Sequence, residues 1–168
     1  TGEFAGLVGP SGSGKTTLLN IMGSLDKPTE GKAIVMGRNI SDLSHKESAE
    51  LRNLHIGFIF QVYNLLPVYT VFENVEFALI LQNKGAARAM VKRPEIVLAD
   101  EPTANLDAAN AHAIIQTMKK LNEELNTTFL FSTHDEKVMG YLNRMIHLRD
   151  GKVDQDELVT PKSTATSI

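Results

Sequence analysis

One run of residues near the start of the chain has the composition needed to hold phosphate groups. It reads Gly9-Pro10-Ser11-Gly12-Ser13-Gly14-Lys15-Thr16 and matches the pattern G-x-x-x-x-G-K-[ST]. Glycines let successive backbone N–H groups curve around phosphate oxygens without a clash from a Cβ atom. Lys15 can then reach the outer phosphates, and the Thr16 hydroxyl can bind Mg²⁺. The run therefore predicts a phosphate-binding loop that extends to Thr17, in preference to a merely flexible glycine turn.

Two carboxylates follow an apolar run later in the chain. Asp100 and Glu101 come directly after Ile96-Val97-Leu98-Ala99. Asp100 could hold Mg²⁺ through its water shell, and Glu101 could polarise a water molecule that attacks a phosphate. Taken alone the pair decides little, because a buried strand often ends in a charged turn. Behind a phosphate-binding loop, it favours a site that hydrolyses a nucleotide.

Two further polar residues also follow apolar runs. The amide of Gln61, after residues 56–60, could touch the metal or the water. The imidazole of His134, after residues 129–133, could hydrogen-bond a terminal phosphate or orient the water. A single Gln or His in such a position more often has only a structural role. The functional interpretation therefore depends on both residues following apolar runs, as Asp100 and Glu101 do.

The order of predicted elements explains how these residues could meet. Apolar runs predict strands, and apolar positions at helical spacing predict helices. The expected strands are 4–8, 33–36, 56–60, 95–99, 127–131 and 145–148, and the expected helices are 15–22, 44–53, 73–81 and 107–125. This alternation predicts an α/β fold with a parallel sheet covered on both faces. Ligands bind outside the carboxyl ends of such strands, and all the residues singled out above fall there.

Composition narrows the class of protein. The 168 residues are 42% hydrophobic and 22% charged, as in an ordinary globular domain. The chain has no cysteine, which excludes a disulfide scaffold, a thiolate metal site and a cysteine nucleophile. The net charge is -3, so no nucleic-acid partner is expected. The longest apolar run, residues 77–81, is far shorter than the roughly 20 residues that span a bilayer.

In order and spacing, these motifs resemble those of the ATP-binding-cassette (ABC) ATPases over nearly the whole chain. Residues 9–16 resemble the Walker A motif, residues 96–100 Walker B and residues 104–107 the D-loop. The resemblance implies a P-loop NTPase (RecA-like) core with a mostly parallel sheet flanked by helices. It implies that Lys15, Glu101 and His134 are catalytic, and that Thr16, Gln61 and Asp100 hold Mg²⁺ beside ATP.

The resemblance also implies a cellular role. Residues 61–67 and 131–135 are most similar to the lipoprotein-releasing and macrolide-export branch. A member of that branch would be an ATP-hydrolysing subunit docked on an integral-membrane permease. It would lie on the cytoplasmic, inner face of the cell membrane and act as a homodimer that sandwiches two ATP molecules.

Two parts of the family pattern are missing. No signature motif of the LSGGQ type occurs, and the residues on either side of its expected place meet at Gly85 and Ala86. The opening strand with the aromatic residue that stacks on adenine is absent too, and none of the three tyrosines stands in its place. Either the helical signature subdomain is deleted, or a disordered lobe is omitted between Gly85 and Ala86. We expect the second, with residues 1–159 as the ATP-binding domain and 160–168 as a polar tail.

Three other functions compete with this interpretation. An ABC-type ATPase acting on DNA or the ribosome would need coiled-coil arms, tandem cassettes or a basic stripe, and none is visible. A small-molecule kinase would need an acceptor pocket and lid arginines, whereas Asp100, Glu101 and His134 favour water as the acceptor. A truncated module that binds nucleotide and hydrolyses it weakly stays open because of the missing segment.

Overall fold

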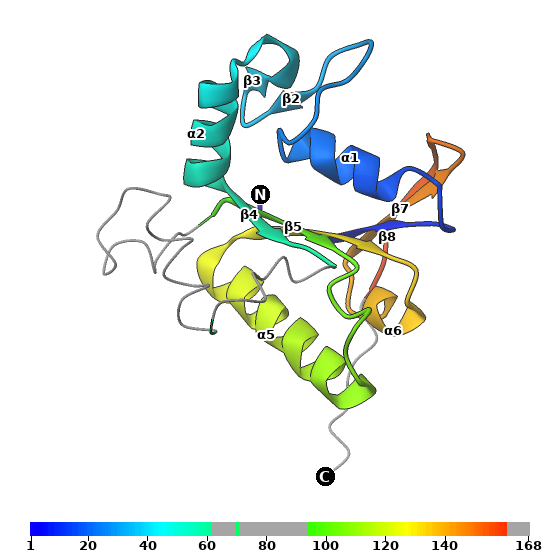
Figure 1. The fold of residues 1–168 in the computed structure, drawn as a ribbon. Coiled ribbons are helices and arrows are strands. Elements are labelled where there is room, and N and C mark those ends of the chain that lie inside the picture. Colours follow the sequence, from blue (N-terminus) through cyan, green and yellow to red (C-terminus); the bar gives the residue numbers. More distant parts are fainter. Residues whose placement is uncertain (62–69, 71–93, 161–168) are drawn as a thin grey trace.

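The computed structural model describes residues 1–61, 70 and 94–160, and a six-stranded sheet forms its centre (Figure 1). The sheet has the order β4-β5-β6-β1-β7-β8. Its neighbouring strands are parallel except for β7 and β8, which are antiparallel. The strands are β1 (Phe4–Val8), β4 (Ile56–Ile59), β5 (Ile96–Asp100), β6 (Thr128–Thr133), β7 (Arg144–Arg149) and β8 (Lys152–Leu158). The predicted α/β class with a mostly parallel sheet is therefore confirmed.

Helices cover both faces of the sheet. On one face lie α1 (Lys15–Met22) and α2 (His45–His55), together with the short hairpin of β2 (Ile34–Val35) and β3 (Arg38–Asn39) (Figure 1). A single 3₁₀ turn, η1 (Ile40–Asp42), joins this hairpin to α2. On the other face lie α5 (Ala108–Leu125) and α6 (Glu136–Met139) (Figure 1).

Each face of the sheet has its own apolar core because side chains alternate along a strand. In β1, Phe4 and Val8 pack into the core under α5 and α6. Leu7, on the opposite face, packs with Leu19 of α1 and Leu51 of α2. A strand buried on both faces needs an unbroken apolar run, which is how β1, β5 and β6 read in the sequence.

The helix starts agree with the sequence signals. Ser44 caps α2 in a complete capping box: its hydroxyl accepts from the Glu47 N–H, and the Glu47 carboxylate accepts from the Ser44 N–H. Asp107 caps α5 by accepting from the backbone N–H of Asn110 at 2.9 Å. Both helices therefore begin within a residue of the predicted positions.

Other boundaries differ from the prediction. The second strand covers residues 34–35 rather than 33–36, Asp100 is the last residue of β5 rather than the first after it, and β6 continues to Thr133. The elements β3, η1, α6 and β8 were not predicted at all, because they are short or, like the exposed and polar β8, lack an apolar pattern.

Several predictions concern residues that the structure does not describe. The helix expected at 73–81 and the junction of Gly85 with Ala86 lie outside the described residues, as does the tail from 161 onward. Among the helices in the described ranges, none has both the length and the apolar character that crossing a bilayer requires.

Candidate nucleotide-binding site

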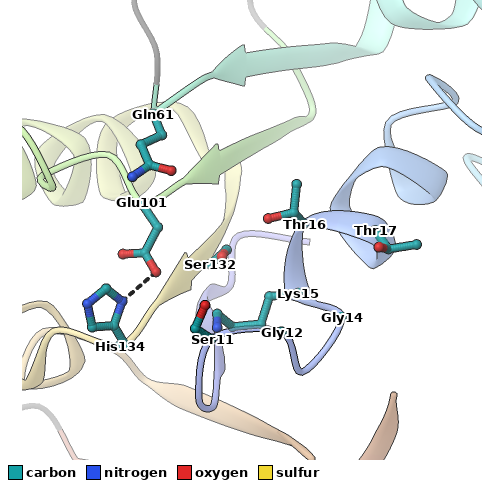
Figure 2. Close-up of a pocket in the computed structure, with 10 residues that line it drawn as sticks. All are labelled: Ser11, Gly12, Gly14, Lys15, Thr16, Thr17, Gln61, Glu101, Ser132 and His134. Atoms are coloured by element: carbon teal, nitrogen blue, oxygen red, sulfur yellow. Dashed lines mark hydrogen bonds and ion pairs between the residues drawn. The ribbon is translucent and has the colours of Figure 1, made fainter. Parts of the chain in front are cut away.

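The carboxyl ends of four adjacent parallel strands, in the order β4-β5-β6-β1, meet around one cavity. The cavity has a volume of about 320 Å³. Figure 2 shows the ten residues that line it, which are Ser11, Gly12, Gly14, Lys15, Thr16, Thr17, Gln61, Glu101, Ser132 and His134. Nine of these ten were predicted from the sequence, because strand ends at one edge of a parallel sheet are close in space.

The phosphate-binding loop connects β1 to α1 and closes on its own lysine. The Lys15 ammonium donates to the carbonyl oxygens of Gly9 at 2.8 Å and Pro10 at 2.9 Å. Lys15 is only 7% exposed, so these carbonyls compensate a nearly buried charge. The phosphates of a nucleotide would offer this ammonium a stronger, charged partner.

The strand β7 and the β7–β8 turn contact the phosphate-binding loop. The N–H of Gly151, in the β7–β8 turn, donates to the carbonyl of Ser13 at 3.1 Å. A Cβ atom at Gly9 would collide with the carbonyl oxygen of Leu148 in β7. Four residues predicted for the site are not among the described residues that line the cavity: Gly9, Pro10, Ser13 and Asp100.

Thr16 and Asp100 form the part of the site that suits a metal ion. The Thr16 hydroxyl lies 3.0 Å and 3.2 Å from the two carboxylate oxygens of Asp100. Hydroxyl and carboxylate oxygens are the hard ligands that Mg²⁺ prefers, and Mg²⁺ usually keeps waters and substrate phosphates as its remaining ligands. Within the described ranges, no group of three or more His, Cys, Asp and Glu side chains could hold a metal. The Thr16 hydroxyl beside the Asp100 carboxylate fits a magnesium ion that arrives with a nucleotide.

Glu101 and His134 form a second polar pair across the cavity. Nδ1 of His134 lies 2.7 Å from a carboxylate oxygen of Glu101 (Figure 2). The Glu101 side chain is 13% exposed, whereas that of His134 is 72% exposed. Glu101 has a φ of 45°, which is unusual for a residue with a side chain, and its N–H donates to the Ser132 carbonyl at 2.9 Å. This fixed backbone directs a sheltered carboxylate at the cavity.

Gln61 reaches the cavity from the neighbouring strand β4, and its side chain extends toward Glu101 (Figure 2). Its backbone carbonyl accepts from the Asn105 side-chain amide at 2.9 Å. This bond ties the end of β4 to the segment that precedes α5. Asn105 belongs to the segment 104–107 that resembles the D-loop. Its contact with Gln61 could not be predicted from the sequence, because the two residues are 44 positions apart in the chain.

One residue that lines the cavity, Ser132, was not predicted from the sequence. It is completely buried at the end of β6 and lies opposite Asp100 in the register of β5 and β6. The signal was available in principle, since a serine inside an apolar strand two residues before His134 is out of character for a core position.

This chain is similar in sequence to known ABC transporter proteins. A family model described as ABC transporter matches residues 1–87. The ABC transporter ATP-binding protein MJ0796 of Methanocaldococcus jannaschii is 39% identical, and the alignment covers 93% of this chain and 84% of that protein. This chain belongs to the ABC transporter family. Its predicted enzyme class, an ATPase of this family, is thereby confirmed.

Further relatives agree with the assignment to the ABC transporter family. A lipoprotein-releasing system ATP-binding protein of Shewanella denitrificans is 35% identical, and the alignment covers 93% of this chain and 83% of that protein. Two solved dimeric structures of the M. jannaschii cassette, one of them bound to ADP and Pi, each cover 95% of this chain and 86% of theirs at 38% identity. Their TM-scores are 0.85 and 0.86, which confirms the fold.

The alignments with the two relatives are longer than this ABC family chain itself. They extend over 197 and 193 residues, against the 168 residues present here. Each relative therefore carries residues that have no counterpart in this chain.

Proposed function

We propose that this chain is the ATP-binding and ATP-hydrolysing subunit of an ABC transporter that powers a permease of the lipoprotein-release or macrolide-export type. One observation carries the proposal: the Glu101–His134 pair lines the same cavity as the phosphate-binding loop, whose Thr16 bonds to Asp100. The transport branch is supported by the relative named as part of a lipoprotein-releasing system.

Binding begins at the phosphate loop. The backbone N–H groups of residues 11–16 and the N-terminal end of α1 offer partial positive charge to the phosphates. Lys15 exchanges its two carbonyl partners, Gly9 and Pro10, for phosphate oxygens. Because the loop already has its curved shape, little conformational entropy is lost when ATP binds.

Thr16, Asp100 and Gln61 would hold Mg²⁺. When bound, the ion would neutralise charge that develops on the phosphates during the reaction. The Thr16 hydroxyl can keep donating to Asp100 while its oxygen lone pair faces the cavity, so this pair needs no rearrangement to receive a cation.

Glu101 would take a proton from the attacking water. The water oxygen forms a bond to the terminal phosphorus, and the bond from that phosphorus to the bridging oxygen of ADP breaks. The water's proton passes to the Glu101 carboxylate, which is close enough to the cavity to accept it. His134, exposed and paired with Glu101, would hold the terminal phosphate in line.

Assembly and location extend the same proposal. Two copies would form a homodimer around two ATP molecules, supported by the dimeric solved structures of a relative. The permease would be an integral-membrane protein, and this chain would sit on the cytoplasmic face of the membrane beside it. A DNA-bound or ribosome-bound ABC ATPase finds no comparable support.

The missing signature motif limits what this chain can do. We propose that residues 1–159 are one ATP-binding domain and that its helical signature part is missing between Gly85 and Ala86, which the longer alignments support. A chain without that part would bind ATP and hydrolyse it weakly, since the family pattern has each copy complete its partner's site. A nucleotide-binding module with weak hydrolysis is therefore the second candidate.

One experiment separates these candidates. The full chain is incubated with ATP and Mg²⁺, and both equilibrium binding and release of inorganic phosphate are measured. Binding with phosphate release supports the ATPase, and binding with little release supports the weak module. Absence of binding overturns both. Co-purification of the tagged chain with a membrane protein, as opposed to nucleic acid, then tests the transport role.

A further inference from the structure

The Ser132 hydroxyl is buried at the nucleotide cavity without a hydrogen-bond partner. Ser132 is 0% exposed, and its Oγ makes no hydrogen bond to any group within residues 1–61, 70 and 94–160. It nevertheless belongs to the lining of the cavity, together with Thr16 and Glu101. Burying an unpaired hydroxyl is unfavourable, so such a group beside a binding cavity calls for a partner that the bound ligand brings.

The sheet register shows what lies beside this hydroxyl. Ser132 is paired with Asp100 on β5 and with Leu7 on β1. Leu130 and Leu98, two residues earlier on the same two strands, both pack into the core on the α1 side of the sheet. Because side chains alternate along a strand, Ser132 and Asp100 face that same side. Ser132 therefore lies in the row between the Mg²⁺ candidate Asp100 and the strand that leads into the phosphate loop.

Figure 2 agrees with this placement. The Ser132 side chain stands at the end of β6, between Glu101 and the residues of the phosphate loop. β6 itself lies between β5 and β1 in the sheet, so this central position does not depend on the direction of view.

The chemistry of Thr16 and Asp100 indicates which ligand could bond to the Ser132 hydroxyl. Both Asp100 carboxylate oxygens face one hydroxyl, that of Thr16, and that hydroxyl has a single proton to donate. Asp100 does not itself line the cavity but touches it through Thr16, and a carboxylate that accepts this one proton keeps lone pairs for a water molecule. Mg²⁺ dehydrates reluctantly and binds carboxylates partly through its own waters. A metal-bound water beside Asp100 would have a lone pair or a proton for a neighbouring hydroxyl.

We propose that Ser132 is a positioning residue whose hydroxyl bonds to a water of the magnesium hydration shell, next to Asp100. The inference rests on the proposed function, since it needs Mg²⁺ and a nucleotide in this cavity. It assigns to Ser132 a part in metal-dependent nucleotide binding, separate from the contacts of the phosphate loop.

The test compares binding of ATP with Mg²⁺ and binding of ATP with EDTA in the full chain. Ser132→Thr and Ser132→Val form a matched pair, equal in branching and close in volume, that differ in the hydroxyl. We expect Ser132→Val and Ser132→Ala to weaken binding of the magnesium complex by up to about tenfold, the upper end for one hydrogen bond to a water molecule. Binding with EDTA should stay unchanged, and Ser132→Thr should keep most of the magnesium effect.

A second serine supplies the control. Ser24, at the end of α1, is also buried and also has an unpartnered hydroxyl, but it does not line the cavity. Ser24→Ala should leave the magnesium dependence as in the wild type. The unfolding temperature of the empty Ser132→Ala protein should equal or exceed that of the wild type, because the variant removes an unpaired buried group; a merely structural serine would show a clear decrease.

The outcomes distinguish this inference from the proposed function. If the wild type binds ATP more tightly with Mg²⁺, and Ser132→Val does so to the same extent, the inference is wrong and the proposed function stands. If Ser132→Val weakens binding equally with Mg²⁺ and with EDTA, Ser132 shapes the pocket and the metal role is wrong. If the wild type binds no ATP under either condition, both the inference and the proposed function fail.

Discussion

The Thr16 hydroxyl spans the gap between the phosphate loop and β5 to reach both carboxylate oxygens of Asp100, at 3.0 Å and 3.2 Å. This contact joins residues that lie 84 positions apart. It brings the first turn of α1 and the end of β5 together before any ligand binds. A cation that needs both oxygen types therefore meets a pair that is already assembled.

Replacing Thr16 by valine removes this hydroxyl and nearly preserves the side-chain shape. We expect the variant to bind ATP with Mg²⁺ about tenfold more weakly and to bind ATP with EDTA almost as the wild type does. Titration of a fluorescent ATP analogue in both buffers measures the difference. Thr117→Val, on the exposed side of α5, is the control. Equal loss in both buffers would show that Thr16 supports the loop and has no part in holding the metal.

Glu101→Gln tests the proton acceptor. The change keeps the size and hydrogen-bonding capacity of the side chain but removes its basicity, so release of inorganic phosphate should fall by at least about a hundredfold. ATP affinity should remain within about twofold, because the phosphate loop is untouched. Glu123→Gln, on the exposed surface of α5, is the matched control. Unchanged hydrolysis in Glu101→Gln would remove Glu101 from the mechanism.

Gly9→Ala tests the close approach between the phosphate loop and β7. The new Cβ atom would collide with the carbonyl oxygen of Leu148, and backbone cannot move away as a flexible side chain can. We expect a lower unfolding temperature and ATP binding weakened by about tenfold or more. Gly31→Ala provides the comparison, because Gly31 also has a positive φ but no atom of the described part of the chain lies within 4 Å of an added Cβ. Equal effects of both changes would show that backbone strain, and not the contact with β7, matters at Gly9.

Asp107 makes the stability of α5 depend on pH. Hydrogen bonds from the backbone N–H and then the side chain of Asn110 lower the pKa of the Asp107 carboxyl below its ordinary value of 3.8. A lowered pKa in the folded chain stabilises it above the ordinary pKa, and this stabilisation disappears as the pH falls through the folded-state pKa. Asp107→Ala should therefore lower the unfolding temperature by a few degrees at neutral pH.

The same comparison repeated in acid checks the sign. As the pH falls below 3.8 and through the lowered folded-state pKa of Asp107, the difference in unfolding temperature between the wild type and Asp107→Ala should shrink, because protonation removes the charge of the cap. Asp107→Asn keeps a capping group without a titrating charge, so its difference from Asp107→Ala should change little with pH. A gap between the wild type and Asp107→Ala that grows in acid would contradict the assigned direction.

Local patterns explain why most of the fold could be predicted. Apolar runs marked β1, β5 and β6, because strands buried on both faces have to be apolar throughout, and a similar run marked β4, which lies at the edge of the sheet and is only partly buried. The β8 strand, Lys152–Leu158, escaped because it lies at the exposed edge of the sheet, where polar residues are tolerated. β8 pairs antiparallel with β7 across a tight turn. The apolar residues of β7 and the turn itself could predict a hairpin, but the polar composition of β8 does not predict a strand.

The chemistry of the site could be predicted from the order of residues alone: a glycine-rich loop with Lys15 and Thr16, and acids and a histidine placed after apolar strands. Those features depend on residue type and local order, which can be read along the chain. The contacts between Thr16 and Asp100 and between His134 and Glu101 appear first in the folded chain, as does the cavity position of Ser132, whose hydroxyl has no partner among the described residues. These contacts depend on the order of strands in the sheet, which brings distant segments side by side through packing that no local pattern records.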